Sequence, residues 1–214
     1  MGLLDLEEQL VFVALPLPHT VHSLACPHTD HGGAPQQYGS YHAHPTNIKI
    51  HIIFVPILMF VMMSMGANVP LPLPLVPSDY ANLSTAVAAV YSVGYVLLSP
   101  LPGAILAPYV LAQALIGSYS VHHVDGFNRY AAAVQVVSWI SQFIGHGVYE
   151  GRAPALLDNI MQALFLAPLF VWIEVLFMLG WNQELKHRLD GQIAQKRKEM
   201  DLAKKKKKAE GKEL

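Results

Sequence analysis

Three polar residues on one face of an apolar helix are the first candidates for chemistry. Gln142, His146 and Glu150 follow one another at four-residue intervals inside a mostly apolar stretch. Residues four apart on an α-helix are neighbours, so these side chains can share a ligand. Ionisable groups in an apolar helix are costly and by default indicate a functional site. They also serve as proton relays or packing pairs, and spacing alone leaves both interpretations open.

A second polar set has the same spacing and lies earlier in the chain: Tyr38 with His42, and Asn47 with His51. Pro45 separates the two pairs and should end a first helix, because the residue before proline avoids the α region. Thr46 or Asn47 would then cap a new helix. This turn can bring His42 and His51 together although nine residues separate them.

A metal ion is the ligand that these two sets would share. If they lie on the same side of a membrane, four side chains can converge: His42, His51, His146 and Glu150. Three imidazoles and a carboxylate suit Fe(II), Mn or Zn, and a site with open positions for substrate and oxygen fits non-haem iron. Asn47, Gln142 and Tyr38 would then orient the ligands through hydrogen bonds.

Other polar residues leave alternatives open. Arg152 presents a planar fork that suits a substrate carboxylate, but it can also pair with Asp158 or Glu174. Neighbouring His122 and His123, together with Asp125, form an alternative ligand set. The single Cys26 excludes an intrachain disulfide framework and a zinc cluster of several cysteines.

The composition indicates an integral membrane protein. The chain has 214 residues, of which 53% are hydrophobic and 14% charged, whereas about a quarter of the residues in a soluble domain are charged. Eleven of the 14 Lys and Arg residues lie between Lys186 and Lys212. The positive-inside rule places this basic tail in the cytoplasm. We interpret the tail as a solvated charge run, with contact to anionic lipid as the alternative, and expect no nucleic-acid partner.

The apolar runs predict an all-α fold, a polytopic bundle of four to five transmembrane helices. The predicted spans are residues 48–67, 81–99, 101–119, 131–149 and 160–181, and about 20 residues cross the hydrocarbon core. Pro56 should kink the first span, and the third, with Pro108 and Gln113, could be re-entrant. Residues 69–78 are rich in proline and predict a loop. We expect residues 1–181 to form one membrane-embedded catalytic domain, followed by a basic tail at 182–214 that forms a polar helix from Asn182 onward.

The N-terminal region combines an amphipathic helix with an unusual insertion. Residues 2–12 place Leu3, Leu6 and Leu10 opposite acidic side chains, which is typical of a helix at the membrane surface. The acidic start lacks the basic region of a signal peptide. Residues 13–37 show no helical or strand period and predict a disordered loop. We hypothesise that a retained intron encodes this loop, because Val codons begin with GT and a Gln codon can end in AG.

At these motifs the sequence resembles the fungal 2-hydroxy fatty acid dioxygenases of the endoplasmic reticulum membrane. Three segments carry the resemblance: LLDLEEQLVF, YGSYHAHPTNIKIHIIFVP and SWISQFIGHGVYEGRAPALLDNIMQALFLAPLFVWIEVLF. They cover roughly half of the chain. The family's Tyr-x-x-x-His, Asn-x-x-x-His and Gly-His-x-x-x-Glu patterns fall on Tyr38/His42, Asn47/His51 and Gly145/His146/Glu150. Residues 13–37 depart from the family pattern, in which Phe12 and Tyr38 would be adjacent.

The resemblance implies an Fe(2+)-dependent α-oxidation in phytosphingosine degradation. A 2-hydroxy fatty acid such as 2-hydroxypalmitate and O2 would give a fatty acid one carbon shorter. His42, His51, His146 and Glu150 would be the metal and catalytic residues, and Arg152 and Tyr38 would bind the substrate. The alternatives are a non-enzymatic membrane scaffold or transporter and a zinc-dependent lipid hydrolase. The hydrolase lacks a Gly-x-Ser-x-Gly motif in this sequence, and protein partners are not indicated.

Overall fold

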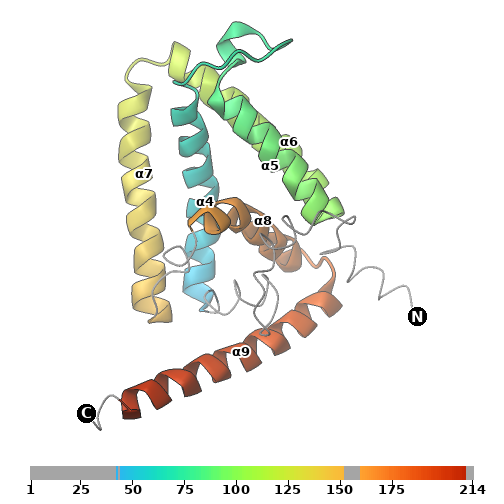
Figure 1. Ribbon diagram of the computed structural model, residues 1–214, viewed down its shortest axis with the longest axis vertical. Helices are drawn as coiled ribbons and strands as arrows, with labels where there is room; N and C mark the ends of the chain where they lie inside the picture. Colours follow the sequence, from blue (N-terminus) through green and yellow to red (C-terminus); the bar gives the residue numbers. More distant parts are fainter. Residues whose placement is uncertain (1–41, 43, 152–159, 211–214) are drawn as a thin grey trace.

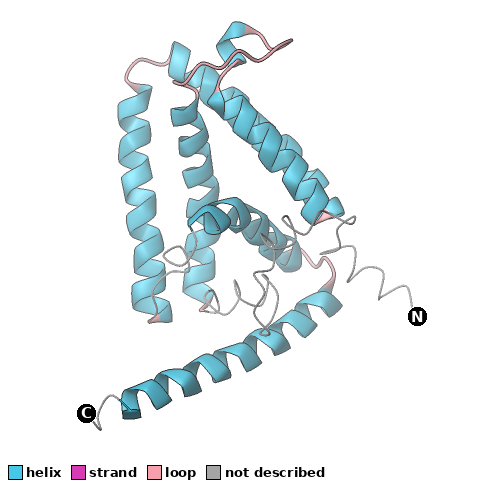
Figure 2. Cartoon of the chain, in the orientation of Figure 1, coloured by secondary structure: helices cyan, strands magenta, loops and turns pink. Residues whose placement is uncertain are grey.

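A computed structural model describes residues 42, 44–151 and 160–210 of the chain (Figure 1). All regular elements in these ranges are helices (Figure 2). The elements are α4 (Pro45–Gly66), the short 3-10 helix η1 (Ser78–Tyr80), α5 (Leu83–Leu98), α6 (Pro100–His123), α7 (Phe127–Ile144), the π-helix η2 (Gly145–Glu150), α8 (Ile160–Met178) and α9 (Gln183–Glu210). The predicted all-α class is thus confirmed for the described residues.

Alternating helix directions bring distant parts of the chain to one end of the bundle. Helices α4 and α7 pack side by side, and α5 pairs with α6 (Figure 1). The N-terminal end of α4 and the C-terminal end of α7 lie at the same end of the molecule, and α9 runs across that end (Figure 1). The two polar sets, at the start of α4 and after the end of α7, therefore lie at the same end of the molecule, where they can converge.

Helix α4 begins two to three residues earlier than predicted. Pro45 is the first helical residue and His44 is the N-cap, whose Nδ1 accepts from the Thr46 N–H at 3.2 Å. Pro is well suited to the first helical position because its missing N–H has no intrahelical partner there. The prediction of Thr46 or Asn47 as the cap is therefore wrong, and Asn47 is instead a buried residue of the first turn.

Small residues allow α5 and α6 to pack closely around the core. Ala88 is fully buried on α5, and Val110 is fully buried on α6. A Cβ added to Gly103 would overlap the backbone of Tyr95, so the two helices approach each other at this glycine. The Tyr95 hydroxyl donates to the Phe165 carbonyl of α8 at 2.8 Å, which ties α8 to the same core.

Two described helices are long and apolar enough to cross a membrane, which suggests membrane association. They are Pro45–Gly66 and Pro100–His123. The prediction of four to five spans is therefore met only in part. Helix α5 has 16 residues and is about 24 Å long, shorter than the roughly 30 Å of hydrocarbon. The apolar part of α8 within the described residues, Leu164–Met178, is also short.

The helix α6 is continuous through Pro108 over 24 residues, so the re-entrant alternative for this segment is not observed. The Gln113 amide of α6 donates to the Pro56 carbonyl of α4 at 3.1 Å. The two candidate spans are thus joined by a hydrogen bond beside a proline, and a buried amide gains a partner there. Residues 69–77 of the Pro-rich segment form a loop, as predicted, and Ser78 begins η1. Leu75 in this loop is fully exposed at a φ of 65°.

Several sequence-based predictions fall outside the described residues. These are the amphipathic helix at 2–12, the loop at 13–37, Tyr38, Arg152 and Asp158. The tail from Gln183 is a polar helix, as predicted.

Candidate metal centre

Three imidazoles meet at the end of the bundle where α4 begins and η2 ends. His42 lies before α4, His51 lies in its second turn, and His146 lies in η2. One ligand nitrogen from each ring lies within 4.8 Å of the others. The ring centroids are 4.3 Å (His42–His51), 4.7 Å (His42–His146) and 4.9 Å (His51–His146) apart, and each pair of rings is nearly perpendicular.

This spacing is compatible with a shared metal ion. Ligand atoms at roughly 2.1 Å from one metal lie about 3.0–3.4 Å from each other, so small side-chain rotations would close the triad around an ion. In the part of the chain that is described, no other three His, Cys, Asp or Glu residues offer such a group. The alternative set of His122, His123 and Asp125 therefore does not assemble, and His123 instead stacks on Tyr119.

The helix backbone fixes the orientation of His51. Its Nδ1 lies 2.9 Å from the carbonyl oxygen of Asn47, one turn earlier. A carbonyl can only accept, so Nδ1 carries the proton and donates. The lone pair is then on Nε2, which is the form that a metal requires. The four-residue spacing of Asn47 and His51 therefore sets the tautomer of a candidate ligand.

His146 lies on a widened helical turn. Helix α7 ends at Ile144 and continues as the π-helix η2, which ends where Gly151 takes a left-handed φ of 61°. Single π turns occur frequently at functional sites. His146 is buried, and burial disfavours the charged imidazole because that form loses its hydration. The uncharged ring is the form that binds a metal.

Two buried polar groups near the triad have no hydrogen-bond partner among the described residues. They are Nδ1 of His146 and the side-chain amide of Gln142, one turn earlier on α7. Buried polar atoms nearly always have a partner, so orphaned ones call for an ion, a water or a ligand. The donor set and the unpaired Nδ1 together fit a metal ion with a polar ligand beside it.

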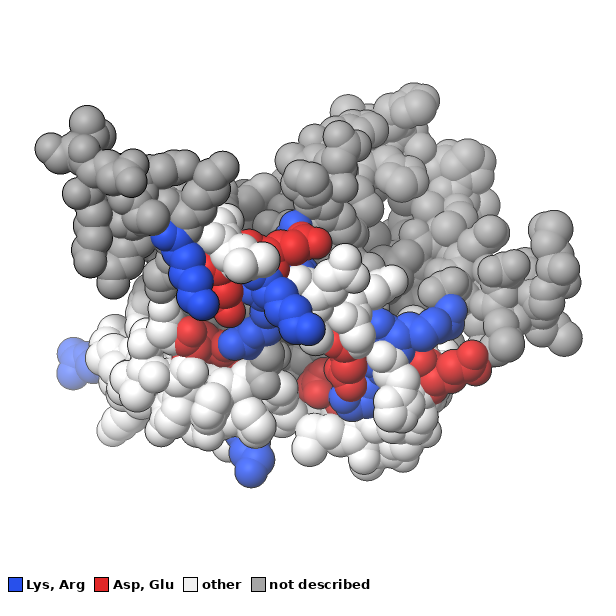
Figure 3. Space-filling model, turned by 90° about the horizontal axis from the view of Figure 1, so that it is seen from below, with Lys and Arg blue, Asp and Glu red and all other residues white. Residues whose placement is uncertain are grey.

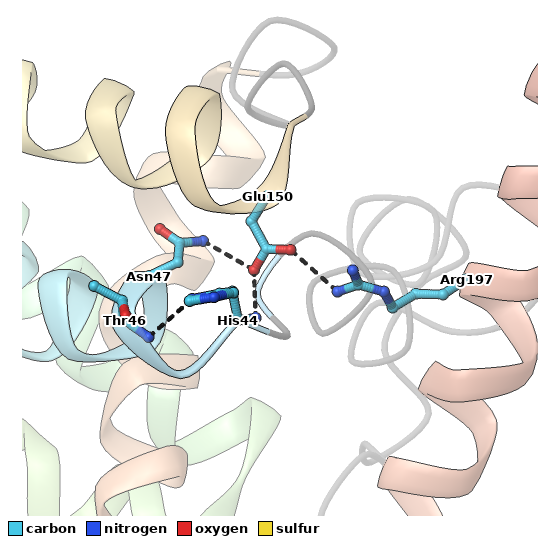
Figure 4. A network of polar contacts seen from close by, with 5 residues as sticks. All are labelled: His44, Thr46, Asn47, Glu150 and Arg197. Carbon is cyan, nitrogen blue, oxygen red and sulfur yellow. Dashed lines mark hydrogen bonds and ion pairs between the residues drawn. The ribbon is translucent and has the colours of Figure 1, made fainter.

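The Glu150 carboxylate ties η2 to the start of α4 (Figure 4). Its Oε1 accepts from the His44 backbone N–H at 2.6 Å and from the Asn47 amide at 3.3 Å. Its Oε2 accepts from Arg197 of α9 at 3.1 Å. The carboxylate is fully buried, and it also lies at the N-terminus of α4, where the helix dipole favours a negative charge.

Asn47 lies at the centre of this arrangement and requires a glycine beside it. Its side chain donates to Glu150, its carbonyl accepts from His51, and it is completely buried. A Cβ added to Gly145 would overlap the Asn47 side-chain oxygen. Gly145 thus provides the space that the Asn47 side chain occupies between α4 and η2.

The structure brings most of the predicted site residues together. His42, His51 and His146 form the triad. Asn47 and Glu150 lie in one hydrogen-bond network. Gln142 is buried on α7, four residues before His146. Glu150 is not a member of the three-residue ligand group. Sequence reasoning missed Arg197, whose only signal was its place in a basic helix.

Two comparisons with known proteins point to the same family. The family model described as "2-hydroxy-palmitic acid dioxygenase Mpo1-like" matches residues 34–179. The chain is 34% identical over 165 residues to the 2-hydroxy-palmitic acid dioxygenase MPO1 of Saccharomyces cerevisiae, an alignment that covers 77% of this chain and 90% of the yeast protein. No solved structure matches the chain.

Proposed function

Because the chain belongs to the Mpo1-like family of 2-hydroxy-palmitic acid dioxygenases, we propose that it is an Fe(2+)-dependent dioxygenase of 2-hydroxy fatty acids. The substrate, such as 2-hydroxypalmitate, would be shortened by one carbon in the presence of O2. The observation that carries the proposal is the convergence of His42, His51 and His146 at one end of the bundle.

His42, His51 and His146 are the residues that would hold the iron. Three neutral imidazoles leave open positions for substrate and oxygen, a pattern that non-haem iron accepts. Bound iron would supply the activation of O2 and a docking point for the 2-hydroxy and carboxylate oxygens of the acid. The protein's part is to orient these ligands and to keep the site buried.

Glu150 fits a positioning role better than the ligand role expected from its sequence spacing. Both carboxylate oxygens accept hydrogen bonds, from His44 and Asn47 on one side and from Arg197 on the other. Carboxylates that are engaged in this way fix the geometry of neighbouring ligands. Glu150 therefore fastens the segment that carries His42 and the turn that carries His51.

The substrate contacts remain predictions of the sequence. Arg152 would bind the carboxylate through its planar fork, and Tyr38 would bind the substrate with its hydroxyl. The unpaired Gln142 amide is available for a polar group of the acid. The reaction balances without an external reductant: the acid and O2 give the shortened acid, CO2 and one water, and the substrate supplies all the electrons.

We propose that the site works at the surface of the endoplasmic reticulum membrane, as a multi-pass protein in sphingolipid long-chain base degradation. Large apolar side chains remain exposed on the outer faces of α5, α6 and α7, among them Val90, Ile116 and Val136, as a lipid environment favours. Two candidate spans support membrane association. A fatty acid can then enter the buried triad from the bilayer.

The test is the conversion of 2-hydroxypalmitate by the purified, iron-loaded protein in detergent. We expect pentadecanoate to form with one O2 consumed per product, no product without O2, and no reaction with palmitate, which lacks the hydroxyl that would chelate the metal. Folded, iron-loaded protein that leaves 2-hydroxypalmitate unchanged would contradict the proposal. Hydrolysis of a lipid ester by the zinc-loaded protein would instead favour the hydrolase alternative.

A further inference from the structure

An arginine from the C-terminal helix contacts the carboxylate that organises the triad. Arg197 Nη1 lies 3.1 Å from Glu150 Oε2, although 47 residues separate them in the sequence (Figure 4). Arg197 belongs to α9, which begins after the last residue that the family model matches. Seen from below, α9 presents basic and acidic side chains together on this end of the molecule (Figure 3).

The environment of Glu150 makes a positive partner important. Its side chain is fully buried, whereas that of Arg197 is 30% exposed. A buried carboxylate that loses its cation is strongly destabilised. Arg197 also fixes the direction of Oε2, so its loss would allow the carboxylate to turn away from the His44 N–H and the Asn47 amide, from which Oε1 now accepts hydrogen bonds.

Those two hydrogen bonds lead directly to the triad. The His44 N–H belongs to the segment that carries His42, two residues earlier, and the His44 side chain caps the start of α4. Asn47 receives the His51 Nδ1–H on its carbonyl oxygen. Weaker hydrogen bonds to Glu150 would therefore loosen the positions of both His42 and His51.

We propose that Arg197 is a positioning residue for the metal centre, which acts through Glu150 and makes α9 part of the catalytic unit. This inference rests on the proposed function, because it concerns the same three imidazoles. The contact of Arg197 within the described residues is with Glu150, so its effect on the metal would be indirect. In this view the contact between Arg197 and Glu150 connects the C-terminal helix to the metal centre.

The experiment measures Fe(II) affinity in the full-length protein. Metal-free wild type, Arg197→Gln, Arg197→Lys and Lys198→Gln are titrated anaerobically with Fe(II) against a chromophoric chelator. We expect Arg197→Gln to weaken Fe(II) binding by about 10- to 100-fold, as the loss of a group that orients ligands does. Arg197→Lys keeps the charge and should recover part of the affinity. Lys198→Gln removes the same charge from an exposed neighbour and should change nothing.

A double variant shows whether the effect runs through Glu150. If it does, Arg197→Gln should add little in a Glu150→Gln background, because coupled residues are not additive. Wild-type Fe(II) affinity in Arg197→Gln would overturn the proposal. So would an unchanged affinity with a raised KM for 2-hydroxypalmitate, which would make Arg197 a substrate contact. A loss of affinity that matches a lowered melting temperature of the metal-free protein would reduce Arg197 to a structural role.

The outcome is separable from that of the proposed function. Protein that binds Fe(II) at the triad but does not oxidise 2-hydroxypalmitate would contradict the function, while the affinity comparison would still decide the role of Arg197. An active wild type together with an unchanged Fe(II) affinity in Arg197→Gln would support the proposed function and reject the positioning role of Arg197.

Discussion

Adding one methyl group at Gly145 should damage the metal centre without contacting a metal ligand. A Cβ at this position would overlap the buried side-chain oxygen of Asn47. The backbone itself tolerates alanine, since Gly145 has φ −53° and ψ −50°. Gly147, two residues later in η2, has no atom within 4 Å of an added Cβ among the described residues, so Gly147→Ala is a matched control.

The expected loss of Fe(II) affinity follows from the hydrogen bond to Glu150 that Asn47 would lose. Hydrogen bonds to charged groups contribute about 1.5–3 kcal/mol, and the Asn47–Glu150 contact is of this kind. If the whole loss falls on the arrangement of His51 and Glu150, Fe(II) affinity should fall about 10- to 150-fold in Gly145→Ala. Alanine is favoured over glycine in helices by roughly 0.5–1 kcal/mol, so Gly147→Ala should be equally or slightly more stable.

The assay is the same anaerobic Fe(II) titration, combined with thermal unfolding of the metal-free proteins. We expect Gly145→Ala to remain folded and to bind Fe(II) weakly, and Gly147→Ala to bind it like wild type. Equal Fe(II) affinities in the two variants would refute the idea that Asn47 and Glu150 orient the ligands.

Two further predictions concern stability away from the metal centre. Asn82→Ala removes the cap of α5 and the hydrogen bond to the buried Ser118 hydroxyl, so the free energy of unfolding should fall by about 1–2 kcal/mol. The Fe(II) affinity of the folded protein should not change, and a loss of affinity would show that α5 couples to the site. Gly103→Ala forces a methyl group against the Tyr95 backbone, which cannot rotate away. This change should lower the melting temperature far more than Gly191→Ala, whose added Cβ meets no atom of the described residues within 4 Å; equal melting temperatures would contradict the close helix contact.

Much of the site could be predicted because it depends on local spacing. Four-residue intervals predicted that Asn47 lies beside His51 and that Gln142, His146 and Glu150 share a face. The antiparallel order of α4 and α7 then places both sets at one end. Their convergence needed an assumption about topology that the sequence alone could not test.

Other features had no local signal. The π turn of η2 could not be predicted, because the four-residue spacing of His146 and Glu150 in the sequence is the same whether the segment forms a π-helix or an α-helix. Arg197 reaches Glu150 through tertiary packing of α9, and one basic residue in a basic helix is not distinctive. The predicted spans are met in part, since two described helices are long enough to cross a membrane. The apolar run at 81–99 was predicted as a span, but α5 covers only 16 of its residues and ends before Ser99.

The central claim is that His42, His51 and His146 bind one iron, and the Fe(II) stoichiometry of His146→Ala tests it most directly. His123→Ala is the control, because His123 is exposed and stacks on Tyr119. The account predicts one Fe(II) per chain in wild type and in His123→Ala, and loss of binding in a His146→Ala protein that still unfolds cooperatively. Full Fe(II) binding by folded His146→Ala would contradict the account.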